Sequence, residues 1–338
     1  MKQVHKYVLG GALIAIALVL PLLTDSRGTI NLLTHIFIIA IFAMSYDILL
    51  GYTGIVSFGH ALFFGSGAYI TGMILRNAGN DVENAVIALV AALLFALLMA
   101  VIIGVLSLRV RETYFAMLTL AFGELFFIGA LKLRSYTGGE DGFSFKVPTL
   151  LQDRVGYYYL AFVVLVIVAY LLRIFISSPT GKVLQAIREN ERRTEAIGFD
   201  VFRYKLLSLA VAGTTASLAG VLFALQERFV SASVLGLGKT IDALLMTIVG
   251  GTGTLYGAIV GSALISLTQE GFTSLARDYP IFERWQILFG IVYVVVVLFF
   301  PGGLVRAFNR LVNKEKVLSR PRQQIKESMK GLMRYLGR

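Results

Sequence analysis

The chain has 338 residues, of which 57% are hydrophobic and 15% are charged. Soluble domains carry about a quarter charged residues, so this composition excludes a soluble enzyme and predicts an integral membrane protein with many crossings. The chain has no cysteine and three histidines, His5, His35 and His60, which show no metal-ligand spacing. We therefore expect no catalytic residue, no metal site and no cofactor.

Apolar runs of roughly 20 residues, the length that crosses a bilayer as a helix, follow one another along the chain. They are Tyr7–Leu23, Ile30–Leu50, Phe58–Leu75, Val86–Leu108, Tyr114–Leu131, Tyr157–Ile176, Leu206–Leu225 and Trp285–Phe300. The first could instead be a cleaved signal peptide, but no small-residue cleavage site follows it. Between the last two, Ile241–Gly251 is too short to cross alone, and Thr252–Thr254 separates it from Leu255–Leu267.

Basic residues predict which ends of these spans face the cytoplasm. Seven lie between Arg173 and Lys205, and ten lie in the tail after residue 303. Both stretches should be cytoplasmic under the positive-inside rule, so an even number of crossings separates them and Ile241–Gly251 counts as one. The predicted fold is an all-α integral membrane protein, a polytopic bundle of about ten transmembrane helices with broken or short spans. Both termini and the Arg109–Arg111 loop lie inside, and Lys132–Gly156 lies outside.

The predicted organisation is a membrane domain at 1–304, with a charged loop at about 177–205, and a basic cytoplasmic tail at 305–338. Apolar residues of the tail share one helical face: Ile325, Met329, Leu332, Met333 and Leu336. This pattern predicts an interfacial helix that lies on the lipids of the anionic inner leaflet. Nucleic-acid binding is the alternative explanation of the charge, but membrane adjacency already accounts for it, so we expect no nucleic-acid partner.

The charged stretch Gly181–Gly198 predicts a surface on which a soluble partner docks. Residues at helical three- and four-residue steps form one face, Val183, Ile187, Asn190, Thr194 and Ile197, and the charged residues turn away from it. This is the pattern of a short amphipathic helix presented to water. A solvated connector with some helix is the alternative. The predicted docking residues are Arg188, Glu189, Asn190, Glu191, Glu195 and Gly198.

Two glycine-rich segments, at 51–60 and 250–254, indicate spans that break inside the membrane. No phosphate-binding motif is complete: Gly238-Lys239-Thr240 has Ser233 where the P-loop requires a glycine, and Gly251–Tyr256 misses the dinucleotide fingerprint at its last position. Non-helical backbone at membrane depth is stable only where protein or a watery cavity satisfies it, and paired breaks point to a substrate path. Tight helix packing is the alternative explanation of these glycines.

Ionisable residues also occur within or near the spans. Glu124 lies near the middle of Tyr114–Leu131 and must face protein or water. It could bind substrate or relay protons, but a structural hydrogen bond to a neighbouring helix is the simpler explanation. The predicted translocation path consists of Ser57, His60, Glu124, Gly250, Gly251 and Gly253.

Five segments carry a recognisable pattern. They are Gly51–Gly72 (GYTGIVSFGHALFFGSGAYITG), Tyr114–Leu120 (YFAMLTL), Thr137–Ser144 (TGGEDGFS), Gly181–Leu206 with AIRENE and EAIG, and Gly250–Leu264. In this order they resemble the LivM-type permease subunits of branched-chain amino acid ABC importers. The resemblance extends from about Asn31 to Leu304, nearly all of the membrane domain.

The resemblance implies a non-catalytic permease subunit of the bacterial inner membrane. It also implies two cytoplasmic ATP-binding subunits, a second homologous permease subunit and a periplasmic solute-binding protein as partners, and a branched-chain or related amino acid as substrate. Gly181–Gly198 then becomes the coupling helix that docks on an ATPase subunit. From the residues alone, the alternative is a stand-alone secondary transporter that uses Glu124 or Asp242 for ion coupling. Relatives with such sequences carry amino acids, amides or urea.

Overall fold

The computed structural model describes residues 21, 26–110, 112–276 and 290. The predicted spans at 7–23 and 285–300 lie outside the described residues, single positions excepted, and so does the basic tail. The long helices are α2 (Arg27–Asp47), α3 (His60–Asn77), α4 (Val82–Ser107), α5 (Glu112–Lys132), α7 (Arg154–Ser177), α10 (Val201–Glu227), α11 (Leu237–Gly250) and α12 (Leu255–Ala276). The short elements are the π-helix η1 (Ile48–Thr53), α6 (Arg134–Thr137), η2 (Thr149–Leu151), α8 (Pro179–Glu189), α9 (Glu191–Ala196) and η3 (Ala232–Leu235), with the strands β1 (Phe143–Ser144) and β2 (Phe229–Val230).

Each predicted span that falls in the described residues corresponds to a helix. Within the described residues, five helical segments are long and apolar enough to cross a membrane, and the pair α11 and α12, bent by 113°, makes a sixth candidate. The helix α3 fails this test because its glycines and polar residues dilute its apolar character, and it is instead almost wholly buried among other helices. The chain is therefore a multi-pass membrane protein, while the total of about ten crossings stays a prediction.

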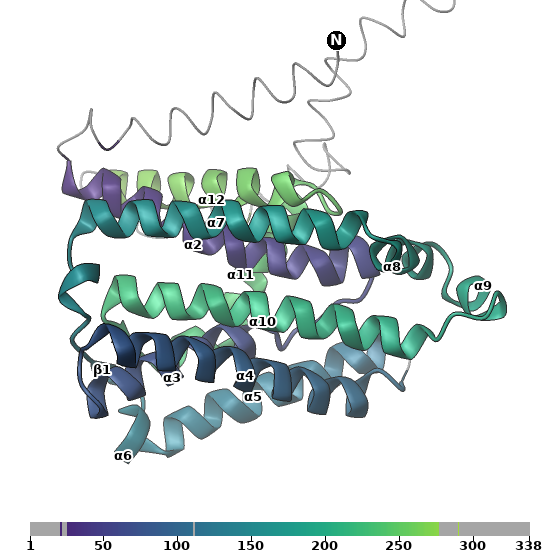
Figure 1. Cartoon of the computed structure of the whole chain (residues 1–338), viewed down its shortest axis with the longest axis horizontal. Helices are drawn as coiled ribbons and strands as arrows, with labels where there is room; N and C mark the ends of the chain where they lie inside the picture. Colours follow the sequence, from purple (N-terminus) through teal and green to yellow (C-terminus); the bar gives the residue numbers. More distant parts are fainter. Residues whose placement is uncertain (1–20, 22–25, 111, 277–289, 291–338) are drawn as a thin grey trace, which may run out of the picture.

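Apart from α11, which is bent by 113° from α12, the long helices run roughly side by side, with α6 and β1 at the opposite end of the bundle from α8 and α9 (Figure 1). At one end, α8 and α9 project beyond the bundle, and Arg109 lies over the Phe202 ring at the start of α10. At the other end, β1 pairs with β2 in antiparallel register, and the Arg228 guanidinium donates to the Gln152 carbonyl. Arg109 and the loop at 177–205 thus share one end, and the loop at 132–156 lies at the opposite end, which is the alternation that the charge pattern predicts.

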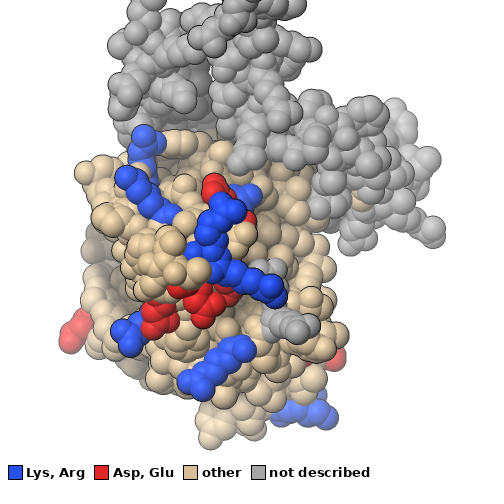
Figure 2. Space-filling view, turned by 90° about the vertical axis from the view of Figure 1, so that its right-hand side faces the viewer, with Lys and Arg blue, Asp and Glu red and all other residues tan. Residues whose placement is uncertain are grey.

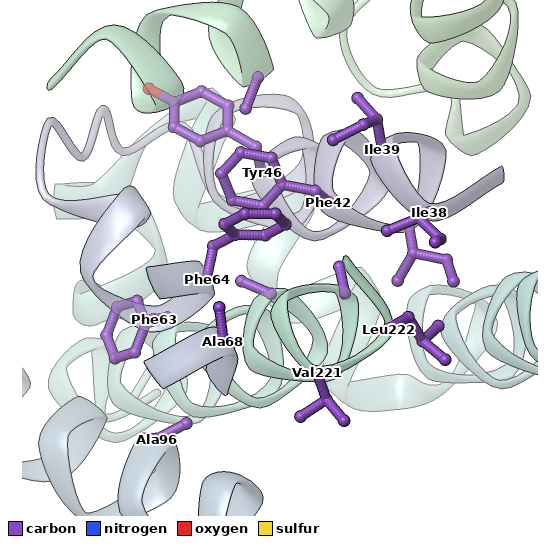
Figure 3. Packing of buried hydrophobic residues seen from close by; sticks show 14 of the residues in the cluster. Ile38, Ile39, Phe42, Tyr46, Phe63, Phe64, Ala68, Ala96, Val221 and Leu222 are labelled. Carbon is purple, nitrogen blue, oxygen red and sulfur yellow. The ribbon is translucent and has the colours of Figure 1, made fainter. Parts of the chain in front are cut away.

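The helix α2 forms the centre of the bundle. Its second half is buried throughout, and Phe42 packs on Phe64 of α3 with 4.6 Å between ring centroids (Figure 3). Small residues let the surrounding helices approach closely. A Cβ at Gly220 of α10 would collide with the Phe64 carbonyl, and one at Gly261 of α12 would collide with the Met246 carbonyl of α11. These two glycines therefore permit close helix packing.

The outer faces of α4 and α7 are apolar and exposed. On α4 these residues include Val86, Val90, Leu94, Leu97 and Leu98, which recur at helical spacing along one side. The opposite side of the helix is lined by fully buried alanines. A helix with small residues on its inner face and bulky apolar residues on its outer face suits contact with lipid tails, because no polar group has to be desolvated there.

Candidate docking surface and helix breaks

The predicted docking helix is two helices that meet at Asn190. Ser178 caps α8, where its hydroxyl accepts from the Gly181 amide at 3.3 Å, and Pro179 occupies the first turn. The backbone of Asn190 is then extended rather than helical, with φ −162°. The Asn190 side chain accepts from the Arg193 amide at 2.9 Å and so caps the start of α9. The single helix expected over 181–198 is therefore wrong. Asn190 prefers to cap a new helix over continuing the old one.

The buried face of this region also differs from the expected one. Leu184 and Ile187 of α8 pack with Val201 in a small core of their own, and Thr194 is buried on α9. Asn190 and Ile197, expected on the buried face, are exposed, and Ile197 is 67% exposed. The turn at Asn190 changes the helical phase, so a pattern counted through it places the residues beyond it on the wrong side.

Two of the predicted docking residues bind the membrane domain instead of facing solvent alone. The Glu191 carboxylate pairs with Lys205 of α10 at 2.7 Å, and the Lys205 side chain is only 8% exposed. The Arg188 guanidinium donates to the Gly51 carbonyl, and its aliphatic stem lies against Gly54. The residues Glu189, Asn190, Glu195 and Gly198 are exposed, together with Arg192 and Arg193. Figure 2 shows acidic and basic side chains side by side on this end of the molecule.

The first break, residues 48–59, joins α2 to α3. The π-helix η1 ends at Gly54, whose φ of +83° is a left-handed conformation that favours glycine, and the Ile55 amide donates to the Leu49 carbonyl at 3.0 Å. The extended residues that follow are held by neighbouring helices. The Thr53 and Ser208 hydroxyls lie 2.5 Å apart, and the Phe58 amide donates to the Thr119 hydroxyl at 3.2 Å. The backbone of this break is thus satisfied by protein, as its depth requires.

Ser57 and His60 are buried at the end of the first break. The Ser57 carbonyl accepts from the Tyr46 hydroxyl at 3.1 Å, and its own hydroxyl has no hydrogen-bond partner among the described residues. The His60 ring stacks on Phe42, and its Nε2 lies 2.8 Å from the Ser45 hydroxyl, while Nδ1 has no partner in the described chain. These polar atoms are oriented by α2.

The second break, residues 251–254, lies against the first. The Gly253 amide donates to the Asp47 carboxyl at 2.7 Å, and Gly51 leaves the space in which this contact forms. Gly251 and Gly253 have φ values of +120° and +73°, which a β-carbon would strain. Gly250 packs against the Gly257 carbonyl, so the same short segment also closes α11 onto α12.

The structure brings five of the six predicted path residues together around the second half of α2. The Thr247 hydroxyl of α11 donates to the Ala43 carbonyl at 3.1 Å, and the Ala61 amide of α3 donates to Thr240 at 2.9 Å. Glu124 is separate. It lies on α5 beside Gly123, the residue that approaches Gly59, and it is half-buried, with no hydrogen bond or ion pair to another described residue.

Two cavities, one apolar and one lined by polar side chains, lie away from the predicted path residues. One of about 430 Å³ is apolar and lies between α3, α5 and η3. Another, of about 520 Å³, lies among α2, α10 and α12 near the β1–β2 end and is lined largely by polar side chains, including His35, Glu227 and Glu270. Among the described residues, no group of three or more His, Asp or Glu side chains is placed to hold a metal ion. The contacts of the path residues position and pack the backbone. Among these residues, no nucleophile, base and orienting group form a catalytic triad.

The sequence reasoning missed Asp47 as the link between the breaks, and it missed the contact of Arg188 with Gly51. The spacing of Asp47 four residues before Gly51 puts both on one helical face and was a usable signal. The contact with Gly253 had no such signal, because 206 positions separate it from Asp47.

Comparison with known proteins identifies the family. Residues 28–300 match the family described as the branched-chain amino acid transport system / permease component. The chain is 26% identical over 322 residues to the high-affinity branched-chain amino acid transport system permease protein LivM of Salmonella typhimurium, covering 87% of this chain and 73% of that protein. It is 26% identical to LivM of Escherichia coli over 324 residues, with the same coverage, and 24% identical over 288 residues to BraD of Pseudomonas aeruginosa, covering 79% and 91%. No solved structure matches. A multi-pass chain with two helix breaks in contact and a charged element at one end thus belongs to the family of permease components of branched-chain amino acid transport systems.

Proposed function

We propose that the chain is one permease subunit of an ABC importer for branched-chain or related amino acids, and that separate cytoplasmic subunits hydrolyse the ATP. Family membership supports the transport role, and the names of its relatives refer to branched-chain amino acid transport. The observation that carries the proposal is the projecting pair α8 and α9. An exposed, charged, capped element at the end of an apolar bundle has no lipid to contact and suits a soluble partner (Figure 2).

The docking surface is defined by the exposed residues of this element: Glu189, Asn190, Arg192, Arg193, Glu195, Ile197 and Gly198. Ile197 is an apolar side chain, 67% exposed, within a rim of charges. An exposed apolar anchor surrounded by polar residues is the arrangement found at protein interfaces. Arg188 and Glu191 stay in the proposal as parts of the coupling region, but their contacts with Gly51 and Lys205 give them a supporting place within it.

The remaining partners follow from this role. They are two ATP-binding subunits, a second homologous permease subunit and a periplasmic solute-binding protein. The basic residues of the loop at 177–205 support a cytoplasmic position for α8 and α9, and hence a bacterial inner-membrane orientation with both termini inside. The solute-binding protein then meets the β1–β2 end.

In this proposal, substrate crosses where the two helix breaks lie, and no chemistry occurs in this subunit. Closure of the ATPase subunits displaces α8 and α9, and the spans α7 and α10 that they join reshape the path around Ser57, His60, Gly250, Gly251 and Gly253. Glu124 is placed at the margin of this path on α5. A carboxylate at membrane depth needs water or a polar partner, which a path beside α5 would provide. No feature of the described residues favours a stand-alone secondary transporter.

Co-purification tests the docking surface. The chain is expressed with the two ATP-binding subunits from the neighbouring genes, and the variant Ile197→Asp is compared with Leu150→Asp. Leu150 is 74% exposed at the opposite end of the molecule and serves as the matched control. We expect Ile197→Asp to lose the ATPase subunits and Leu150→Asp to retain them. Retention by both variants, in correctly inserted protein, would contradict docking through this surface.

A further inference from the structure

We propose that Arg188 is a positioning residue that ties the docking region to both helix breaks, so that a displacement of α8 moves the two breaks together. The inference rests on the proposed function, because it concerns how a movement of α8 and α9 reaches the membrane domain. The helical pattern turns Arg188 toward a soluble partner. In the structure the residue stays exposed, while its guanidinium donates to the membrane domain.

The first step of this connection is between α8 and the first break. The Arg188 guanidinium donates to the carbonyl of Gly51 in η1, and a Cβ at Gly54 would come within 2.9 Å of the Arg188 Cγ. The rest of α8 packs through the small core around Leu184 and Ile187, in which Val201 belongs to α10, and Phe175 of α7 packs against both this core and the main core. Arg188 adds a charged hydrogen bond from α8 to the first break, so a movement of α8 is passed to the break as well as to α7 and α10.

The second step joins the first break to the second. Gly51, the acceptor for Arg188, is also the residue whose missing side chain lets the Asp47 carboxyl meet the Gly253 amide at 2.7 Å. A β-carbon at Gly51 would collide with both Asp47 Oδ1 and Gly253 N. The three segments therefore meet at one glycine, and η1 cannot shift without pushing on or pulling from the second break.

A second arginine ties the same end of the molecule to the second break from the other side. Arg173, near the end of α7 and just before α8, donates to the Tyr256 hydroxyl at 2.6 Å and lies over the Tyr256 ring. Tyr256 is the second residue of α12, directly after the break. Thus α8 contacts the first break through Arg188, and the end of α7 that leads into α8 contacts the exit of the second break through Arg173. Two separate attachments favour movement of both breaks as one body.

A purely structural role of Arg188 would use the same contacts, so the test measures a movement of the first break. The chain has no native cysteine, and Ser57 is buried in the first break, which makes Ser57→Cys a single-thiol reporter. In the isolated chain, Arg188→Ala should raise the rate of N-ethylmaleimide labelling about tenfold, the change that loss of one charge-assisted hydrogen bond produces in a local opening equilibrium. Arg188→Lys should restore part of the protection, and Arg192→Ala, an exposed arginine of α9, should leave the rate unchanged.

The decisive comparison uses the assembled complex with ATP and vanadate. We expect nucleotide to change the Ser57→Cys labelling rate, and we expect Arg188→Ala to abolish this change while ATP hydrolysis continues. Arg188→Met, which keeps an aliphatic side chain and has no donor, gives the same comparison should the alanine variant fail to fold. A nucleotide effect that survives both substitutions would overturn the inference, as would a complex that hydrolyses ATP without any change at Ser57→Cys. Failure of the unaltered chain to bind the ATPase subunits would overturn the proposed function instead.

Discussion

Gly51 offers the sharpest test of the packing that joins the two breaks. Its backbone is helical, so alanine is permitted by conformation and only the surroundings oppose it. The added Cβ would collide with the Asp47 carboxyl and with the Gly253 amide, neither of which is the end of a free, flexible chain. We expect Gly51→Ala to force the two breaks apart.

The magnitude follows from the two contacts that must change. A hydrogen bond to a charged group contributes about 1.5–3 kcal/mol, and overpacking a well-packed site costs about 1–3 kcal/mol. Separation of Gly253 from Asp47 removes the first, and residual crowding adds part of the second. The free energy of unfolding should therefore fall by about 3–5 kcal/mol.

The assay is an SDS-unfolding titration of the purified chain in detergent micelles, followed by circular dichroism. Gly129→Ala is the matched control, because Gly129 lies within α5 and a Cβ there meets nothing within 4 Å. Alanine should stabilise that position by up to about 1 kcal/mol. Equal unfolding free energies for Gly51→Ala and Gly129→Ala would show that the breaks do not meet at Gly51.

Two further predictions concern the joint between α9 and α10 and the topology. Glu191→Gln should destabilise the chain by about 1–2 kcal/mol, since Lys205 is left buried without its partner while the half-exposed carboxylate is partly screened. The double variant with Lys205→Met should recover most of that loss in the same titration, and purely additive effects would refute the pairing. Single cysteines at Ser144, Asn190 and Ser328, probed with an impermeant thiol reagent in intact cells, should label only at Ser144. Labelling at Ser328 would overturn the cytoplasmic tail.

Hydrophobic runs predicted the long helices well because burial in lipid is a local property of sequence. The runs at Val86–Leu108 and Tyr157–Ile176 became α4 and α7 with bounds displaced by a few residues. At α7 the Asp153 cap extends the helix beyond its apolar part. The distribution of basic residues predicted which loops share an end of the bundle. These inferences need no knowledge of which helix touches which.

The docking region was harder to predict because its helical phase depends on one residue. Asn190 was counted as a face residue, although an asparagine within a charged stretch is as well suited to a cap. Once the chain turns there, Ile197 moves from the expected core to the surface, and Glu191 moves toward Lys205. The glycine breaks were visible in the sequence. Their mutual contact was not, because it depends on α11 and α2 packing side by side.

In the proposed function, the energy for transport reaches this chain from outside, through the α8–α9 element. The most direct measurement is amino acid uptake into liposomes that contain the purified chain alone, under an imposed proton or sodium gradient, and again with the ATPase subunits, the second permease, the solute-binding protein and ATP. We predict no ATP hydrolysis and no accumulation by the lone chain, and uptake only by the complete assembly. Gradient-driven accumulation by the lone chain that Glu124→Gln abolishes would contradict this account and establish a secondary transporter.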